Sequence, residues 1–158
     1  MMEREWSKLN RQQLGTYAEY YAKMRFTVCG WSVFTSEVDD HGIDFVASPV
    51  KAGTYFEIQV KSICASNYVY IPKDKMCHDQ ANNPLPKNRI VCVANFIDGQ
   101  EPDLYLIPAP EWNKPNELLR DRNYEGKQSK PEWGINLSKK NQHILDKYSF
   151  YNVIKTFE

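Results

Sequence analysis

The chain has 158 residues, enough for one domain of ordinary size with its own hydrophobic core. Hydrophobic residues make up 42% of the sequence and aromatic residues 13%, which excludes an intrinsically disordered chain. Lys and Arg together number 20, and so do Asp and Glu, so any contact with nucleic acid needs a local basic patch in place of an overall positive field.

The first residues, MMEREW, are charged and lack the apolar segment of a secretory signal. No run approaches the roughly 18 apolar residues of a membrane span. The cysteines are far apart and form no CxxC pair, which argues against a zinc site. We therefore expect a cytoplasmic protein that contacts no membrane and keeps its thiols reduced and partly buried. The cysteines are Cys29, Cys64, Cys77 and Cys92.

Apolar residues recur at three- and four-residue steps across residues 10–29, which predicts an amphipathic helix. Gly30 suits the position just beyond the end of this helix. Three strands are expected next, at residues 31–37, 43–48 and 54–62, and in the last of them apolar and polar residues alternate strictly. A turn separates the first two strands, and a connection that contains Pro and Gly separates the second and third.

Residues 67–72 predict a further strand, and an irregular Asn- and Pro-rich segment follows it. The continuous apolar run at residues 89–97 is typical of a central strand that is buried on both faces, and residues 103–109 predict the next strand. The rest of the chain suits, in order, a short helix, an exposed charged loop and a helix with one apolar face, at residues 110–121, 121–133 and 139–156.

The order of these elements predicts the fold class. A helix comes first, then three strands, then more strands, and a helix ends the chain. This order favours a single α/β domain over residues 1–158, with a mixed central β-sheet flanked by helices.

Three polar side chains, Asp44, Gln59 and Lys61, stand inside segments that otherwise have the pattern of core strands. Alternation places Gln59 and Lys61 on one side of their strand, and Ile58 and Val60 on the other side, where they can pack under a helix. If the second and third strands pair, Asp44 comes close to Gln59. The three polar groups can then converge on one point.

The residue types at this point suit a hard metal ion. A carboxylate, a side-chain amide oxygen and a backbone carbonyl make Asp44, Gln59 and Val60 candidate ligands of Mg²⁺ or Mn²⁺. Lys61 is expected to hold the attacking water or to neutralise charge on a phosphate. Glu19 on the first helix is expected to supply an outer carboxylate. Gly42, just before Asp44, permits a bend or the close approach of another group.

The sequence resembles the PD-(D/E)xK nuclease superfamily over residues 15–62, in the order helix Glu, Asp and Gln-x-Lys. It is especially similar to small bacterial domains of the DUF4365 type, and it also resembles Holliday junction resolvase-like and Mrr-type restriction folds. Residues 89–108 are similar to the later strands of that core. The motifs that carry the resemblance are GTYAEYY (15–21), GWSVF (30–34), DDHGIDF (39–45) and EIQVKS (57–62).

The resemblance implies a restriction-endonuclease-like fold and a metal-dependent phosphodiesterase that acts on DNA. It implies that Asp44, Gln59 and Lys61 form the active site, with Glu19 as the helix carboxylate and Mg²⁺ or Mn²⁺ as the cofactor. Gln59 departs from the superfamily pattern, because it stands at the acidic position. The change removes one negative charge, so the affinity for a metal should fall.

Other interpretations stay open at this point. The domain could keep the nuclease fold and serve as a catalytically weak or inactive module that binds DNA or protein. The cluster could also be an ordinary salt-bridged strand pair, in which Lys61 pairs with Asp44 or Glu57. Taken singly, Asp44 suits a turn and Glu19 a solvated helix face. Cleavage of both strands of a duplex would favour a homodimer.

Local basic clusters and aromatic residues are candidates for contact with phosphates and bases. The alternative is that the charges are solvated surface groups and that the aromatic residues belong to the core or its rim. The residues are Lys73, Lys75, Lys87, Arg89, Arg120, Arg122, Lys127 and Lys130, with Tyr68, Tyr70, Trp112 and Trp133.

Overall fold

The computed structural model describes residues 4–37, 41–51, 53–77 and 84–157, and its largest element is a five-stranded sheet. The spatial order of the strands is β1-β2-β3-β5-β6. Strands β3 and β5 are parallel and the other neighbours are antiparallel, so the sheet is mixed, as the sequence predicted. The strands are β1 (Trp31–Thr35), β2 (Phe45–Pro49), β3 (Phe56–Cys64), β5 (Arg89–Phe96) and β6 (Asp103–Pro108).

A second sheet contains three antiparallel strands in the order β4-β8-β7. These strands are β4 (Tyr68–Pro72), β7 (Leu119–Arg122) and β8 (Glu132–Asn136). The helices are α1 (Arg11–Val28), α2 (Lys73–Met76), α3 (Gln142–Leu145) and α4 (Phe150–Ile154), and the 3-10 turns are η1 (Trp6–Lys8), η2 (Ala109–Asn113), η3 (Lys139–Asn141), η4 (Asp146–Tyr148) and η5 (Lys155–Phe157). No helix in the described part of the chain is both long and apolar enough to cross a membrane.

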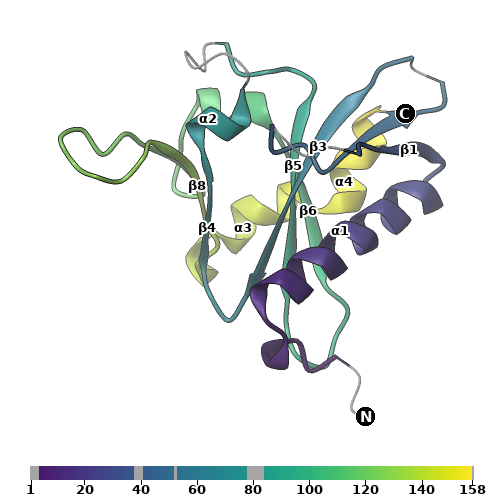
Figure 1. The fold of residues 1–158 in the computed structure, drawn as a ribbon, viewed down its shortest axis with the longest axis horizontal. Coiled ribbons are helices and arrows are strands. Elements are labelled where there is room, and N and C mark those ends of the chain that lie inside the picture. The colour runs from purple at the N-terminus through teal and green to yellow at the C-terminus, as the bar shows by residue number, and fades with distance from the viewer. Residues whose placement is uncertain (1–3, 38–40, 52, 78–83, 158) are drawn as a thin grey trace.

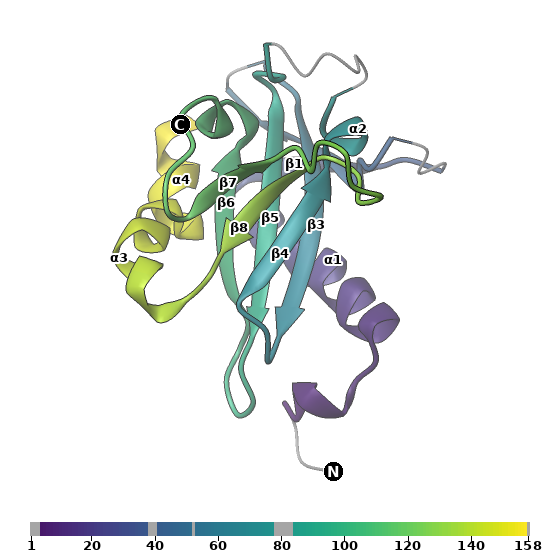
Figure 2. The same ribbon diagram turned by 90° about the vertical axis from the view of Figure 1, so that its left-hand side faces the viewer.

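The two faces of the large sheet are covered differently. Helices α1 and α4 pack on one face of the large sheet, and the small sheet covers the other (Figure 1). In Figure 2 the small sheet lies in front of β3 and β5, and α1 lies behind them. The central strand β5 contributes to both cores: Cys92 faces α1, and Val91 and Val93 face the small sheet. Burial on both faces explains the continuous apolar run that the sequence shows there.

Helix α1 lies within the predicted range of residues 10–29, and it ends just before Gly30 as expected. The Asn10 side chain accepts a hydrogen bond from the Gln13 backbone, and the Gln13 side chain accepts one from the Asn10 backbone, which completes a capping box. The buried residues of the helix, Leu14, Ala18, Ala22 and Phe26, recur every four residues and face the sheet. Just after the helix the chain turns at Gly30, whose φ is +81°.

Asn10→Ala should lower the free energy of unfolding by about 1 kcal/mol, because the first turn of α1 loses its side-chain cap. Urea denaturation measures this as a lower midpoint with an unchanged slope. The exposed Asn113 makes a matched control, and Asn113→Ala should leave the midpoint nearly unchanged. Equal midpoints for Asn10→Ala and the wild type would show that the capping box does not stabilise the fold.

The sequence-based prediction of an exposed loop over residues 121–133 is wrong at both ends. Strand β7 runs to Arg122, and β8 begins at Glu132. Few apolar residues mark these strands: β7 has one buried residue, Leu119, and the buried residues of β8 include the polar Glu132. Their inward side chains, such as Leu119 and Ile135, pack against the large sheet.

The helix predicted over residues 139–156 is divided into short helical pieces. The division falls at Ser149, whose backbone is extended with φ −53° and ψ 142°, and which forms an isolated bridge with Tyr105 of β6. The apolar residues on either side pack into different cores: Leu145 faces the small sheet, and Phe150 packs with α1. The break lets one segment contact both cores.

The turn predicted at 38–42 lies partly outside the described residues.

Candidate active site

Strands β2 and β3 separate at Asp44, and this opening is the centre of the candidate site. The pairing runs from Ala47 opposite Phe56 to Phe45 opposite Ile58, and the Asp44 backbone N–H still donates to the Ile58 carbonyl at 2.9 Å. Beyond that point β3 continues without β2 beside it. The Val60 N–H donates to Asp44 Oδ2 at 2.6 Å, so the carboxylate satisfies a donor on this edge of β3.

The Val60 carbonyl belongs to the same opening. The N–H and the C=O of one strand residue point to the same edge of the strand. Because the Val60 N–H points at Asp44, the Val60 carbonyl also faces the gap left by β2. The structure therefore places the Asp44 carboxylate and the Val60 carbonyl, which the sequence analysis expected to be two of the metal ligands, at the same opening.

The Gln59 side chain is 3% exposed, and its amide reaches the beginning of β2. A Cβ added to Gly42, whose φ is +72°, would lie 2.9 Å from Gln59 Nε2 and 3.2 Å from the Lys75 carbonyl oxygen. Gly42 thus allows the close approach that the sequence predicted. Gln59 Oε1 is buried and has no hydrogen-bond partner within the described part of the chain. An orphaned oxygen of this kind costs about 1–3 kcal/mol, which a bound cation would offset.

Lys61 lies on the same side of β3 as Gln59. The predicted alternation of side chains along β3 is confirmed. Ile58 packs in the core under α1, whereas Ile63, on the face of Gln59 and Lys61, packs in the core under the small sheet. Lys61 is partly exposed, and we find no ion pair for it among the described residues. The interpretation of the cluster as a strand pair with a salt bridge from Lys61 to Asp44 or Glu57 therefore has no support among the described residues, where Glu57 pairs with Arg89.

An open pocket of about 510 Å³ lies between α1 and the gap in the sheet. Glu19, Asp44 and Val60 line it together, so the helix carboxylate faces the same space as the two proposed ligands. Gln59 and Lys61 belong to the opposite face of β3 and are not among the residues that line this pocket. The rest of the wall consists of Gln12, Gly15 and Thr16, for which the sequence pattern indicated no functional role.

Lys23 also belongs to this neighbourhood, although only its i, i+4 spacing from Glu19 indicates this in the sequence. Its ammonium pairs with Glu19 Oε1 at 2.6 Å and lies 5.7 Å from the centre of the Phe45 ring. The Lys23 side chain is 16% exposed and the Glu19 side chain is 35% exposed. The pairing holds the Glu19 carboxylate in one direction along the helix and compensates part of the negative charge of the pocket.

Glu57 and Arg89 form a buried support beside the site. Arg89, which is 1% exposed, donates from Nε at 3.1 Å and from Nη2 at 2.9 Å to Glu57 Oε2. It also donates from Nη1 to the Lys75 carbonyl at 3.0 Å, which fixes the end of α2 next to Gln59. The prediction that Arg89 belongs to a phosphate-binding surface is therefore wrong. The position of Arg89, as the first residue of an apolar strand, did not indicate that its side chain is buried.

The negative charge of Asp44 is also felt on the α1 face of the sheet. Burial, and then the charge of Asp44, raise the pKa of the Cys92 thiol to about 12. Cys92 lies opposite Val60 on the neighbouring strand β5. The thiol stays protonated at neutral pH, and all four cysteines are unpaired in the structure.

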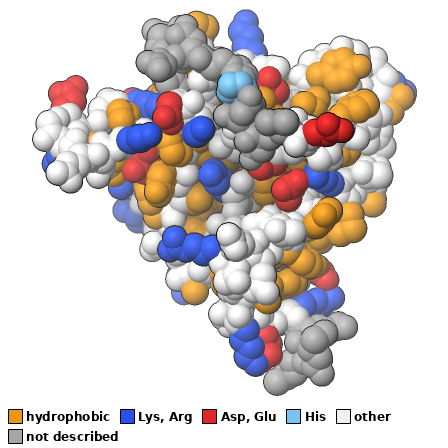
Figure 3. All heavy atoms as spheres, in the orientation of Figure 1, with side chains coloured by type: hydrophobic (Ala, Val, Ile, Leu, Met, Phe, Trp, Pro, Cys, Tyr) orange, Lys and Arg blue, Asp and Glu red, His pale blue; other side chains and the backbone are white. Residues whose placement is uncertain are grey.

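The surface around the site carries both charge signs. Figure 3 shows basic and acidic side chains interspersed over the face seen in Figure 1, with apolar side chains between them. Lys73 pairs with Asp121 and lies 3.9 Å from the centre of the Trp133 ring. Trp112 and Trp133 are 1% and 6% exposed, so both are core residues and the suggestion that they stack on bases is wrong.

The candidate site consists of oxygen donors. Among the described residues, no three His, Cys, Asp or Glu side chains are grouped closely enough to form a metal site by themselves. Asp44 and Glu19 supply carboxylates, and Val60 and Gln59 supply a backbone and an amide carbonyl. A mixed set of this kind suits Mg²⁺ or Mn²⁺, which prefer hard oxygen ligands and keep several waters.

A mixed five-stranded sheet with helix α1 on one face agrees with the restriction-endonuclease-like fold that the sequence predicted. The structure is similar to Hjc, a Holliday junction resolvase from Archaeoglobus fulgidus, with a TM-score of 0.51 and 14% identity over 89% of this chain and 95% of that one. It is also similar to a bacterial homing endonuclease, with a TM-score of 0.51 and 16% identity over 93% of each chain. Both similarities confirm the fold. No protein-family model and no curated protein matches the sequence.

Proposed function

We propose that the protein is a divalent-metal-dependent nuclease that hydrolyses phosphodiester bonds in DNA. One observation carries the proposal: the Asp44 carboxylate fills the gap between β2 and β3, in a pocket that it shares with Glu19 and Val60. The two similar structures are nucleases, and they support this assignment through the shared fold.

Mg²⁺ or Mn²⁺ fits the donors at this gap. Asp44 and the Val60 carbonyl would hold the ion, with Gln59 Oε1 as a third ligand, because this buried oxygen lacks a partner in the described part of the chain. When bound, such an ion polarises a phosphoryl oxygen and lowers the pKa of a water. Gln59 in place of a carboxylate leaves the site with one negative charge less, so we expect weak metal binding.

The charged side chains then have distinct roles. Without a cation, Asp44 and Glu19 would repel a phosphate from the pocket. Lys61 supplies a positive charge from the other face of β3, where it neutralises charge that builds on the phosphate or holds the attacking water. Glu19 accepts a hydrogen bond from a water on the pocket side, and Lys23 keeps its carboxylate in place.

Lys61→Met should reduce DNA cleavage by about 100-fold while the fold is unchanged, because methionine keeps the apolar stem and removes the charge. The assay incubates the purified protein with plasmid, linear, single-stranded and branched DNA, with Mg²⁺, with Mn²⁺ and with EDTA. The exposed Lys147 provides the matched control, and Lys147→Met should cleave like the wild type. Equal products from Lys61→Met and the wild type would mean that another site, or a contaminant, cleaves the DNA.

A second candidate is a nuclease-fold module that binds DNA or protein and does not cleave. Gln59 favours it, because an amide at the acidic position weakens a metal site. Calorimetric titration with Mn²⁺ separates the two functions. A catalytic site should give a binding isotherm that Asp44→Asn removes, whereas a binding module should show no metal response and still bind its partner.

A further inference from the structure

Gly15 lies inside helix α1, four residues after its start, where glycine is an unfavourable choice. Glycine in a helix interior destabilises the helix relative to alanine, because the free backbone loses more entropy on folding. Two structural reasons commonly justify it: a positive φ, or a neighbour too close for a Cβ. Gly15 is not among the glycines with positive φ, and a Cβ added to it would have no described atom within 4 Å. The folded chain itself therefore does not require glycine here.

The position of Gly15 beside the pocket provides a different reason for a glycine there. It lines the candidate active-site pocket, one helical turn before Glu19 and facing Asp44 and Val60. The missing side chain leaves a strip of helix backbone uncovered next to the proposed ligands. A bare backbone strip beside a site is what a close-approaching ligand needs.

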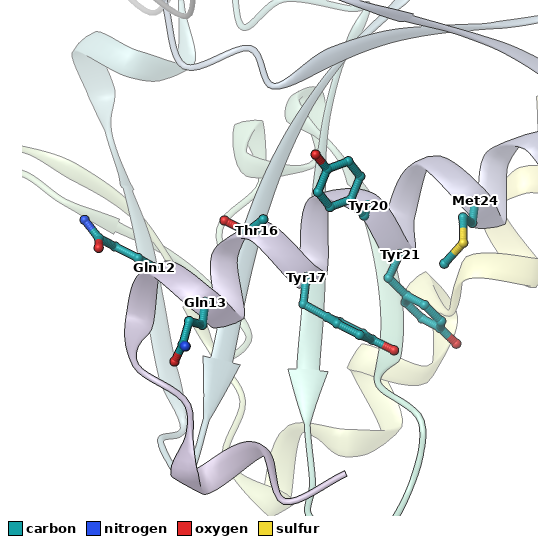
Figure 4. A pocket seen from close by; sticks show the side chains of 7 residues that line it. All are labelled: Gln12, Gln13, Thr16, Tyr17, Tyr20, Tyr21 and Met24. Carbon is teal, nitrogen blue, oxygen red and sulfur yellow. The ribbon is translucent and has the colours of Figure 1, made fainter. Parts of the chain in front are cut away.

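Polar side chains border this strip. Figure 4 shows Gln12, Thr16 and Tyr20 on one side of α1, and Gln13 and Tyr17 on the other. Gln12 and Thr16 are exposed, and they line both the active-site pocket and the neighbouring hollow that Figure 4 draws. An amide and a hydroxyl at successive turns present neutral hydrogen-bond donors to the same space.

We propose that the sugar–phosphate backbone of DNA passes against α1 at Gly15, and that Gln12 and Thr16 donate hydrogen bonds to the phosphate next to the one that is cleaved. The inference rests on the proposed function, since it takes DNA as the ligand of the pocket. Neutral donors suit this place, because they bind phosphate oxygens without forming ion pairs with Glu19 and Asp44. Contacts of this kind position the substrate and read no base sequence.

Gly15→Ala separates this role from a structural one, because the two effects have opposite signs. Alanine favours the helix, so the thermal midpoint should rise. The new methyl group narrows the approach to the pocket, so the affinity for a fluorescently labelled DNA duplex should fall by at least ~10-fold. Thr27→Ala is the matched control, since it also introduces alanine on α1, at an exposed position far from the pocket. It should leave DNA affinity unchanged.

Binding is measured by fluorescence anisotropy, in EDTA and again in Ca²⁺, and cleavage is measured separately in Mg²⁺. A wild type that cleaves DNA and a Gly15→Ala variant that binds and cleaves equally well would overturn this inference and leave the proposed function standing. A wild type that binds without cleaving, with a Gly15→Ala variant that binds weakly, would support the inference and reject the nuclease. A wild type that neither binds nor cleaves DNA would reject both.

Gln12→Ala and Thr16→Ala test the two donors. Each should raise the KM for DNA more than it lowers kcat, because a contact to a neighbouring phosphate holds the substrate in both the ground and transition states. A loss confined to kcat would place these residues in the chemical step and contradict the positioning role.

Discussion

Asp44→Asn should preserve the fold and reduce DNA cleavage by more than about 100-fold, since even the outer-shell partners of a metal are worth 10–100-fold. The asparagine oxygen can still accept the hydrogen bond that Val60 N–H donates to Asp44 Oδ2 at 2.6 Å. The substitution therefore removes the charge and keeps the contact that closes the edge of β3. We expect this loss to exceed that of Lys61→Met, because Asp44 is the only proposed direct ligand with a full negative charge.

The comparison needs both an activity and a stability measurement. Asp103, an exposed aspartate at the start of β6, provides the matched control, and Asp103→Asn should cleave DNA like the wild type. The urea midpoint of Asp44→Asn should stay close to that of the wild type. Normal cleavage by Asp44→Asn would reject the metal site proposed here, whereas a large fall in its midpoint would show that the carboxylate is mainly structural.

Glu57→Ala should lower the free energy of unfolding by about 3 kcal/mol, because it leaves the Arg89 guanidinium buried without its carboxylate. Arg89 is 1% exposed, and two of its N–H groups donate to Glu57. We expect the lower end of the usual range for breaking a buried pair, since the Glu57 side chain is 24% exposed. Urea denaturation measures the change.

Two further variants show whether the buried charge causes this loss. The double substitution Glu57→Ala with Arg89→Met should recover much of the stability, because it removes the unpaired charge as well as its partner. Glu5 pairs with Lys8 at 2.6 Å on the surface, and Glu5→Ala should change the stability by less than about 1 kcal/mol. Equal effects of Glu57→Ala and Glu5→Ala would contradict the buried-pair interpretation.

The elements of the large sheet and helix α1 could be predicted from local patterns. The 3.6-residue period of α1, the alternation in β3 and the apolar run of β5 each report a burial pattern that one segment carries by itself. In the small sheet only β4 was predicted as a strand, and its pairing with β8 and β7 could not be predicted in the same way. Strand β4 pairs with β8 across sixty or more residues of sequence, and the Tyr68 hydroxyl donates a hydrogen bond to Glu132. A short strand with one buried face gives too weak a pattern to stand out from a charged loop.

The candidate site also has parts that follow from local sequence patterns and parts that depend on distant segments. The approach of Asp44 to the Gln59 strand follows from strand alternation and a short connection, both of which are local. The burial of Arg89 depends on α2 and on Glu57 of another strand, so the sequence could not distinguish it from a surface arginine. The significance of Gly15 depends on empty space beside it, and empty space leaves no residue pattern to detect.

The three contacts of Arg89 make the two sheets interdependent. Its guanidinium joins β3 and β5 of the large sheet to the carbonyl of Lys75, which follows β4 of the small sheet. The small sheet therefore helps to hold the part of the large sheet that carries the candidate site. Exchange or loss of β7 and β8 would release β4, shift α2 and disturb the wall around Gln59, even though every proposed ligand would still be encoded.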